Sequence, residues 1–225
     1  MSEENIHSPQ RQRRGRSSVT KNEILQAAEH VAQDGFDALT MRAVAVQMGA
    51  SPMALYRYFA TKDELVDAML DRVLGRIEPG APTADWLADL SDFASAHRRV
   101  LASHQWAIVP LFTHSNPGVN GAIIGEAAFG ILERGGITGG DAVAAFSGIL
   151  ALNYGWFAFT AARDAARTSV DPQEALATEL AMLPADRFPL TLSVAEQLSR
   201  YGSDSHYAFA LQALITGLGA AAKAE

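Results

Sequence analysis

Residues 39–62 read LTMRAVAVQMGASPMALYRYFATK and predict two short helices joined by a tight turn. Ala45 is small enough for the second helix to pack across the first, and Gly49 permits the positive φ that such a turn needs. Leu55 is placed to fill the gap between the two helices. This spacing is typical of a helix-turn-helix, so the stretch favours a DNA-binding function.

Helix start signals surround this motif. Ser51 is suited to the N-cap of the second helix and Pro52 to its first position, where a missing N–H has no cost. Thr20–Glu23 and Thr61–Glu64 carry the S/T-x-x-E capping-box pattern directly before apolar residues at helical spacing. Residues 20–74 therefore predict a small bundle of short helices, which depends on the following segment because a core of this size is marginal alone.

A set of residues in and around the motif matches a known pattern: Leu39-Thr40-x-Arg42, Ala45, Gly49, Leu55-Tyr56-x-Tyr58-Phe59 and Lys62-x-x-Leu65. These residues resemble the DNA-binding domain of the TetR family of transcriptional repressors. The appended Tyr-x-Tyr-Phe and Lys-x-x-Leu elements are more specific than helix-turn-helix spacing alone. The resemblance implies a homodimer that binds a near-palindromic, double-stranded DNA operator and releases it when a small molecule binds elsewhere.

Each candidate DNA contact has a chemical rationale and a structural alternative. Arg42 can contact a phosphate or a guanine edge, or it is a solvated surface residue. Tyr56 can donate its hydroxyl to a phosphate, or its ring packs in the core. Thr40 and Lys62 lie at predicted helix starts, where backbone amides and the helix dipole favour a phosphate.

Two further segments can contact DNA. Residues 52–54 are expected to face outward, where small or apolar groups meet thymine methyls, and Arg57 or Tyr58 can reach the backbone or a base edge. Residues 1–19 predict a flexible basic arm, which in TetR-like proteins can enter the minor groove and is otherwise a solvated tail. The candidate DNA-binding residues are Arg13, Arg14, Arg16, Thr40, Arg42, Ser51, Pro52, Met53, Ala54, Tyr56, Arg57, Tyr58 and Lys62.

The charge distribution supports DNA binding although the whole chain is acidic, at −7 with a pI near 5.4. Eight basic and four acidic residues lie between positions 10 and 62, so this part carries +4 and the remainder −11. A positive part on an acidic body orients the molecule on DNA. Cysteine is absent and the N-terminus is polar throughout, so we expect no disulfide framework, no signal peptide and a cytoplasmic location.

One segment is long enough to span a membrane: residues 142–162 carry no charge. Ser147, Asn153, Tyr154 and Thr160 interrupt it, and many of its other residues are alanine or glycine, which drive insertion weakly. We therefore expect no membrane association. A helix that is apolar on nearly all sides is otherwise buried on both faces, against its own core and against a partner subunit.

Residues 85–225 predict a larger, all-helical domain with Gly/Pro breaks near 78–82, 110, 117–118, 135–140, 171–172, 184–189 and 202. The expected fold is all-α, with an N-terminal helix-turn-helix three-helix bundle followed by a ligand-binding and dimerisation domain. The final helix carries two apolar stripes, which indicates a dimer face beside a core face. It resembles the last helix of tetracycline-repressor C-terminal domains, which implies a homodimer through the helices near Asp141–Ala166 and Ser205–Ala222.

The same resemblance implies a ligand pocket inside each second domain, walled by aromatic and polar residues. Such walls suit a mostly apolar, ring-containing effector, although packing in the core is an alternative role for each of these side chains. The candidate ligand-binding residues are His97, His104, Trp106, Phe112, Phe129, Asn153, Trp156, Phe157 and Phe159.

No cofactor or metal is predicted. His97 and His104, if on one helix, are separated by about 10 Å along its axis, which is too far for one metal ion to bridge. Residues 135–140 lack the preceding strand and the following Lys-Ser/Thr of a phosphate loop, so they indicate an interhelical turn. Tetracycline repressors hold a magnesium-bound drug with a histidine and a carboxylate. The comparable stretch here reads Val109–Phe112 and the carboxylate's place falls at Phe159, so that ligand is not expected.

The sequence thus predicts a ligand-responsive, sequence-specific repressor, with activation of transcription as a variant that the residues leave open. A small-molecule binding protein without DNA function is one alternative, and an enzyme on a helical scaffold is another. Neither accounts for residues 40–62. No Ser/His/Asp set has a recognisable nucleophile context, so we expect no enzymatic activity.

Overall fold

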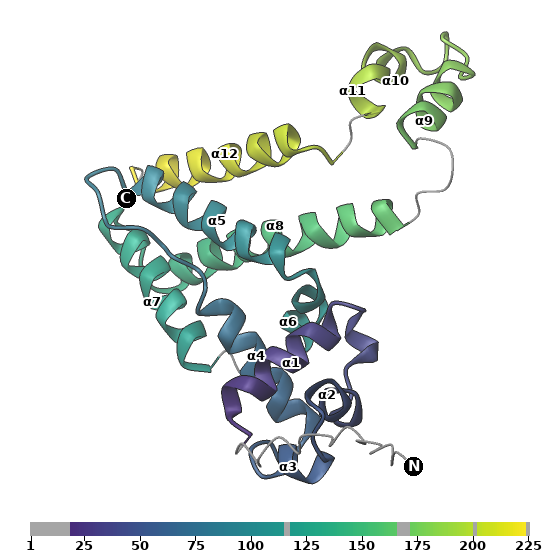
Figure 1. The fold of residues 1–225 in the computed structure, drawn as a ribbon. Coiled ribbons are helices and arrows are strands. Elements are labelled where there is room, and N and C mark those ends of the chain that lie inside the picture. Colours follow the sequence, from purple (N-terminus) through teal and green to yellow (C-terminus); the bar gives the residue numbers. More distant parts are fainter. Residues whose placement is uncertain (1–18, 115–117, 166–171, 200–201, 224–225) are drawn as a thin grey trace, which may run out of the picture.

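The computed structural model describes residues 19–114, 118–165, 172–199 and 202–223 (Figure 1). This part of the chain contains 12 α-helices, two 3-10 helices and no strand, which confirms the all-α prediction. The 3-10 helices are η1 (Phe36–Ala38) and η2 (Gln105–Ala107). The α-helices are α1 (Lys21–Ala32), α2 (Met41–Met48), α3 (Pro52–Tyr56), α4 (Lys62–Leu74), α5 (Trp86–Ser103), α6 (Ile108–Thr113), α7 (Gly118–Arg134), α8 (Gly139–Ala165), α9 (Pro172–Ala181), α10 (Pro189–Ser193), α11 (Ala195–Ser199) and α12 (Asp204–Ala221).

Helices α1 to α4 enclose a core of their own. Ala45 and Leu55 are buried in it, and Gly49 ends α2 in the left-handed conformation with φ +62°. Ile24 of α1 and Leu65 of α4 are fully buried in the same core. The three positions that define the helix-turn-helix in the sequence therefore take the places expected of them.

The two predicted capping boxes differ in how far they form. At α1 the box is complete, because Thr20 Oγ1 accepts from the Glu23 N–H at 3.2 Å and the Glu23 carboxylate accepts from the Thr20 N–H at 2.8 Å. At α4 Thr61 Oγ1 accepts from the Glu64 N–H, but the Glu64 carboxylate accepts from the Ala60 N–H instead of the cap residue. Both helices still begin at the residue after the predicted cap.

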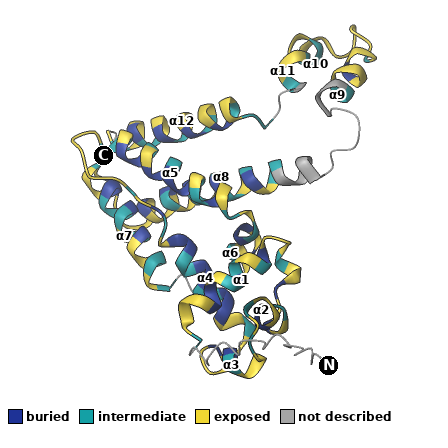
Figure 2. Ribbon diagram, in the orientation of Figure 1, coloured by how far each residue is buried: buried dark blue, intermediate teal, exposed yellow. Residues whose placement is uncertain are grey.

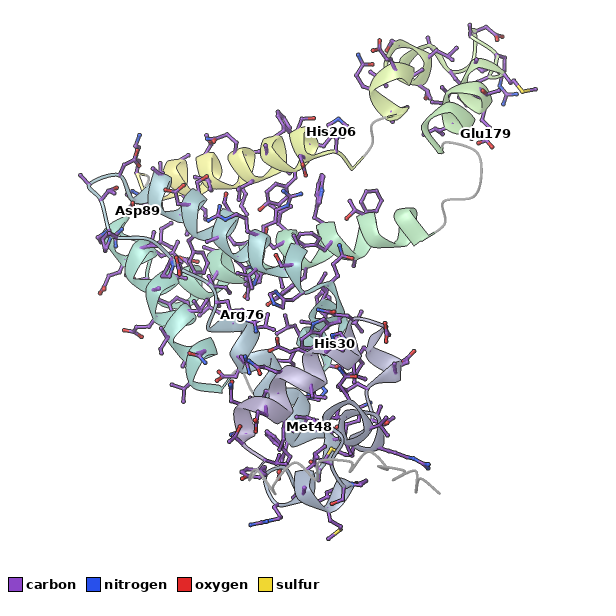
Figure 3. All side chains as sticks on the ribbon, in the orientation of Figure 1. His30, Met48, Arg76, Asp89, Glu179 and His206 are labelled. Carbon is purple, nitrogen blue, oxygen red and sulfur yellow. The ribbon has the colours of Figure 1, made fainter. Side chains whose placement is uncertain are left out.

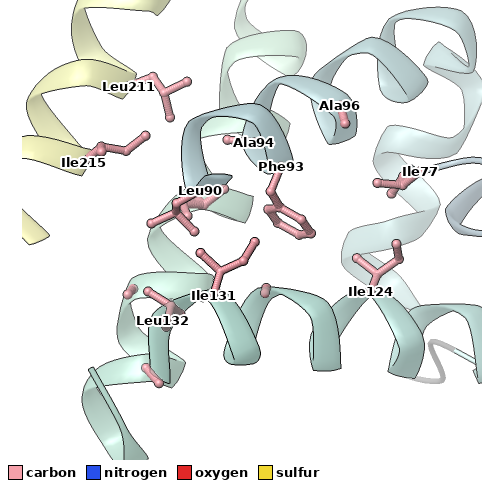
Figure 4. Close-up of a cluster of buried hydrophobic side chains, with 14 of the residues drawn as sticks. Ile77, Leu90, Phe93, Ala94, Ala96, Ile124, Ile131, Leu132, Leu211 and Ile215 are labelled. Carbon is pink, nitrogen blue, oxygen red and sulfur yellow. The ribbon is translucent and has the colours of Figure 1, made fainter. Parts of the chain in front are cut away.

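A second core lies between α5, α7, α8 and α12 (Figure 4). Leu90 and Phe93 of α5 pack with Ile124 and Ile131 of α7, and Ile215 of α12 belongs to the same cluster. Burial of such side chains is the main source of helix stability in a bundle, since isolated helices of this length are marginal in water.

Most of the predicted Gly/Pro breaks that fall on described residues lie between helices. Residues 78–82 separate α4 from α5, and residues 135–138 separate α7 from α8. Pro110 is a correction, because it lies inside α6. It is the third residue of that helix, where the backbone N–H has no intrahelical partner and its absence has no cost.

Helix α4 belongs to both cores. Its residues 65, 66, 69, 70 and 73 lie in the first core, whereas Leu74 lies in the second. The sequence pattern predicts a single apolar stripe on α4, formed by Leu65, Ala68, Met69 and Val73. Six of the 13 residues of α4 are buried, because the helix contacts α1 on one side and α7 on another. Arg72 and Arg76 also pair with Glu29 of α1, at 3.2 and 2.7 Å, and Figure 3 shows Arg76 where the first four helices meet the rest.

Helices α8 and α12 each keep one exposed face (Figure 2). Within the described part of the chain, Gly139–Thr160 of α8 is the one stretch long and apolar enough to cross a membrane, and 28% of its apolar 18-residue window is buried inside the molecule. Its buried side packs on α5, α7 and α12. Val143 of α8 and Phe209 of α12 are exposed, the latter to 78%.

Helices α9, α10 and α11 pack on one another and stand apart from the other helices in Figure 1. Met182, Leu190 and Val194 in this segment are exposed apolar side chains. The segment connects α8 to α12 in sequence and contributes no residue to the first core.

We predict that Leu55→Ala lowers the free energy of unfolding by about 2–5 kcal/mol, because it removes a fully buried side chain and leaves a cavity. Urea denaturation followed by circular dichroism measures this change. Val46→Ala is the matched control, since Val46 is an exposed apolar residue of α2 and its truncation is expected to cost less than about 0.5 kcal/mol. Equal costs for the two variants would contradict the place of Leu55 in the core.

Candidate DNA interface and ligand cavity

The outer surface of α3 carries several of the candidate DNA-binding residues. The helix is shorter than the expected span of residues 51–58. Met53 is 72% exposed and Tyr56 is 46% exposed, so the ring of Tyr56 does not pack in the core. Pro52 occupies the first helical position as predicted. Ser51 lies at the N-cap but makes no side-chain cap hydrogen bond, which corrects the expectation that its hydroxyl caps the helix.

Arg42 of α2 and Arg57, directly after α3, are exposed on the same part of the molecule. Neither forms an ion pair with a carboxylate of the residues that the structure describes. Thr40 is the N-cap of α2, and its Oγ1 accepts from the Ala43 N–H at 3.0 Å. A hydroxyl that accepts in this way keeps its own proton, so Thr40 can still donate to a phosphate oxygen.

Three of the candidates have contacts within the protein. Tyr58 donates its hydroxyl to the carbonyl of Val19 and so ties the residue before the α1 cap to the end of α3. Lys62 lies with its Nζ 5.0 Å from the centre of the Phe36 ring, a cation–π contact. Ala54 is half-buried against the first core, whereas the sequence analysis expected it at an outward-facing tip. Arg13, Arg14 and Arg16 lie outside the described residues.

A cavity of about 440 Å³ lies among α4, α5, α7 and α8. Its walls are mostly apolar, and a few polar side chains interrupt them. The lining residues are Leu70, Leu74, His97, Leu111, His114, Gly121, Ala122, Ile124, Gly125, Glu126, Phe129, Phe146, Leu150 and Tyr154. A cavity of this size and character suits a small organic molecule.

The cavity lining includes His97 and Phe129 from the nine ligand-binding candidates, and Asn153 is buried directly behind His97. The other six pack elsewhere: His104 beside Arg76, Trp106 against the first core, Phe112 at the edge of Tyr154, Trp156 against Tyr207, Phe157 beside Leu101, and Phe159 against Trp156.

Apart from Phe129, the residues that α4 and α7 contribute to the cavity wall were not predicted from the sequence. Leu70 and Leu74 line the cavity, yet they fall off the single stripe that the sequence pattern gave to α4. The surplus of apolar residues on α4 is the signal that could have indicated a second face. Glu126 of α7 and His114 at the end of α6 were missed because their neighbours in space lie on other helices.

A buried chain of hydrogen bonds runs behind the cavity and joins α12, α8 and α5. Tyr207 donates its hydroxyl to Asn153 Oδ1. The Asn153 amide nitrogen lies 2.9 Å from the Ala94 carbonyl oxygen and 2.9 Å from His97 Nδ1. Burial lowers the pKa of His97 to about 4 and raises the pKa of Tyr207 to about 12, so both side chains are neutral near pH 7.

Two carboxylates of α4 bind the residue after α6 and the first turn of α7. Asp67 Oδ1 pairs with His114 Nδ1 at 2.8 Å, and His114 lines the cavity. One turn further along, Asp71 accepts from the backbone N–H of Asn120 at 2.7 Å and from its side-chain amide at 2.9 Å. A Cβ at Gly118 would collide with Asp71, so the close approach of α4 to the start of α7 requires glycine there.

Two protein-family models match this chain. Residues 24–69 match the model of bacterial regulatory proteins of the tetR family, and residues 78–222 match the model of the tetracyclin repressor-like C-terminal domain. The chain belongs to the TetR family. It is therefore a TetR-family transcriptional regulator, and the family resemblance drawn from the helix-turn-helix residues is confirmed.

Curated relatives of this TetR-family chain are transcriptional regulators. It is 29% identical over 218 residues to the HTH-type transcriptional repressor DrrR1 of Streptomyces coeruleorubidus, covering 89% of this chain and 77% of that protein. It is 32% identical over 139 residues to an HTH-type transcriptional regulator of Saccharopolyspora erythraea, covering 61% of this chain and 59% of that protein. The latter match thus spans less than two thirds of the relative's own length.

Solved structures share the fold of this TetR-family chain. ActR of Streptomyces coelicolor without ligand superposes with a TM-score of 0.82 at 24% identity, covering 92% of this chain and 98% of that one. The complex of ActR with actinorhodin superposes with a TM-score of 0.81 at 25% identity, covering 91% of this chain and 98% of ActR.

We predict that this TetR-family protein loses stability between pH 6.5 and pH 4 partly through His97. The unfolded chain binds a proton at this histidine below pH 6.5, whereas the folded state does so only near pH 4, so stability falls as the pH is lowered. The contribution is about 3 kcal/mol. His97→Asn removes the titrating group and keeps an acceptor for Asn153. Urea denaturation at pH 7 and at pH 4, at fixed protein concentration, gives the free energy of unfolding at each pH. This free energy should fall less between pH 7 and pH 4 in the variant than in the wild type. Parallel losses would show that His97 is not buried in its neutral form.

Proposed function

We propose that this TetR-family regulator is a homodimeric, cytoplasmic repressor that leaves a palindromic operator when a small, mostly apolar aromatic effector binds. The proposed domains are a basic arm at 1–19, a DNA-binding domain at 20–74 and an effector and dimerisation domain at 85–225. The observation that carries this proposal is α4, which packs in the core of the helix-turn-helix and also lines the cavity. A carrier of small molecules without DNA function does not require a helix that joins the cavity to a helix-turn-helix.

The proposed DNA surface combines exposed donors with an exposed apolar tip. Arg42 and Arg57 supply unpaired guanidinium groups, and Tyr56 supplies a hydroxyl beside Met53 at the end of the recognition helix. Thr40, Ser51 and Lys62 add phosphate contacts at helix starts, and the arm residues Arg13, Arg14 and Arg16 add minor-groove contacts. Apolar contacts specify bases weakly, so base selection at this tip depends mainly on the arginines.

The proposed dimer interface consists of the exposed faces of α8 and α12. On α8 the exposed residues 144, 147, 151, 155 and 158 are Ala, Ser, Ala, Gly and Ala, which recur at helical spacing and allow a partner helix to approach closely. On α12 the exposed face carries Phe209, a large apolar side chain that is 78% exposed. Two-fold pairing there would set the two recognition helices in successive major grooves, about 34–36 Å apart.

The proposed effector is ring-containing because the cavity wall combines leucines from α4 with phenylalanines from α7 and α8. Leu70 and Leu74 line the cavity together with Phe129 and Phe146. The volume of about 440 Å³ falls in the range of small-molecule sites. ActR, whose solved structure holds actinorhodin, has a similar fold and supports the same class of ligand for this chain.

The proposed signal passes through α4. An effector in the cavity contacts Leu70 and Leu74 directly, and it also shifts His114 and Asn120, which Asp67 and Asp71 bind. Because the other end of α4 packs in the core of the helix-turn-helix, a shift of this helix changes the spacing of the two DNA-binding domains. A ligand can change operator affinity only through such a difference between two states.

The operator half of the proposal is tested by selecting tight binders from a random duplex library at near-physiological salt, where attraction to phosphates alone is weak. Enrichment of one palindrome with half-sites about a turn apart is the expected result. Failure of a folded, dimeric protein to enrich any sequence would overturn the repressor function and leave the cavity as the functional site.

We predict that Arg42→Ala weakens binding to the selected operator by roughly tenfold or more and lowers the salt dependence, because a direct DNA contact is lost. Fluorescence anisotropy with labelled operator over a range of salt concentrations measures both effects. Arg99→Ala is the matched control, since Arg99 is an exposed arginine of α5 and its loss changes the net charge equally. The same loss of operator affinity in both variants would show that the effect of Arg42→Ala comes from the change in net charge. It would contradict a direct contact between Arg42 and DNA.

We also predict that Phe209→Glu converts the dimer to monomer, because it places a charge in the centre of a proposed apolar interface. Sedimentation equilibrium at micromolar concentration measures the mass, and Val109→Glu, at an exposed valine of α6, should remain dimeric. A dimeric Phe209→Glu protein would exclude the α12 face.

A further inference from the structure

The orientation of the Asn153 amide is fixed by its surroundings. The Ala94 carbonyl oxygen, 2.9 Å away, can only accept, so the group that faces it is the amide nitrogen. The amide oxygen then faces Tyr207, whose hydroxyl donates to it. Asn153 is fully buried, and no water competes for these partners.

The same amide nitrogen determines the tautomer of His97. Its second proton points to His97 Nδ1 at 2.9 Å, and a nitrogen that accepts a proton in this way carries none of its own. In a neutral imidazole the ring proton therefore lies on Nε2. The lowered pKa of His97, caused by burial, agrees with the neutral form near pH 7.

The Nε2–H of His97 has no hydrogen-bond partner among the described residues, although the histidine is fully buried and lines the cavity. A buried donor without an acceptor is costly, and most buried polar groups in native proteins have a partner, so this donor calls for an acceptor that a water or a ligand supplies. None of the other polar residues of the cavity lining is hydrogen-bonded to this donor. Tyr154 makes a T-shaped ring contact with His97, with centroids 5.2 Å apart, His114 is paired with Asp67, and Glu126 is exposed on α7.

We propose that the effector carries an uncharged hydrogen-bond acceptor, such as the carbonyl oxygen of a ring ketone, that accepts the Nε2 proton of His97. The proposal rests on the proposed function of the cavity and specifies the chemistry of its ligand. A neutral donor in an apolar wall favours an uncharged acceptor over a carboxylate, because a buried carboxylate would also need a compensating charge. His97 is then a specificity-determining residue, positioned by Asn153 and Tyr207.

A matched pair of probes tests this directly. Fluorene and 9-fluorenone have the same three-ring skeleton and differ in a CH₂ group against a carbonyl, so their affinities for the protein isolate the acceptor. Equilibrium dialysis at low micromolar concentration gives the ratio of the two dissociation constants. Because the compounds also differ in hydrophobicity, the decisive quantity is the change in this ratio between wild type and variant.

We expect the ratio of the fluorene to the 9-fluorenone dissociation constant to fall roughly tenfold from wild type to His97→Phe. This is the change expected when one hydrogen bond to the ligand is lost. His97→Gln, whose amide can again donate near the Nε2 position, should restore part of the preference. His206→Phe is the control, because this histidine of α12 does not line the cavity and the wild-type ratio should persist. His97→Asn, which also lacks a donor at the Nε2 position, replaces His97→Phe if the latter does not fold.

An unchanged ratio in His97→Phe or His97→Asn, with both compounds bound, would overturn the role of His97 and leave the proposed function intact. Failure of wild type to bind either compound would overturn both this proposal and the aromatic effector. Operator selection is measured without any effector, so it separates these outcomes from a failure of the DNA-binding function.

Discussion

The structure depends on one helix that must satisfy two cores. Helix α4 presents Leu65 and Met69 to the helix-turn-helix core and Leu74 to the core of the second part of the chain. Close packing makes such an element move as a unit, because a well-packed interior resists continuous deformation. The cavity wall, the Arg76 to Glu29 ion pair and the carboxylates that hold the start of α7 all meet on α4 or at its end. A displacement of this helix therefore reaches the DNA-binding surface and the cavity together.

The polar groups are arranged around that apolar framework with little redundancy. Asn153 satisfies three neighbours from α5 and α12, which orders them but leaves the Nε2 proton of His97, a residue of the cavity lining, without a partner among the described residues. A fully satisfied network would make the cavity an inert part of the core. The unpaired Nε2 proton of His97 instead gives a mostly apolar cavity a chemical preference for a ligand that can accept it.

Several features could be predicted from local sequence because they depend on neighbours in the chain. The cap at Thr20, the positive φ of Gly49 and the burial of Leu55 follow from spacings of a few residues. Fewer of the cavity-lining residues could be predicted from local sequence. His97 and Phe129 were among its predicted residues, but the α4 wall was missed, because a helix packed on two sides departs from the single-stripe pattern.

The sequence alone determined that the chain is helical, that it contains a helix-turn-helix and that it resembles the TetR family, since these depend on periodicity, caps and short motifs. Tertiary structure decided which aromatic residues face solvent, which pack in a core and which line the cavity. Phe112 and Phe129 have the same side chain and lie in similarly apolar segments, yet the first is 57% exposed and the second lines the cavity. The physical reason is that burial of a side chain depends on helices distant in sequence, and the Nε2 proton of His97 was placed in the same way, by Asn153 on another helix.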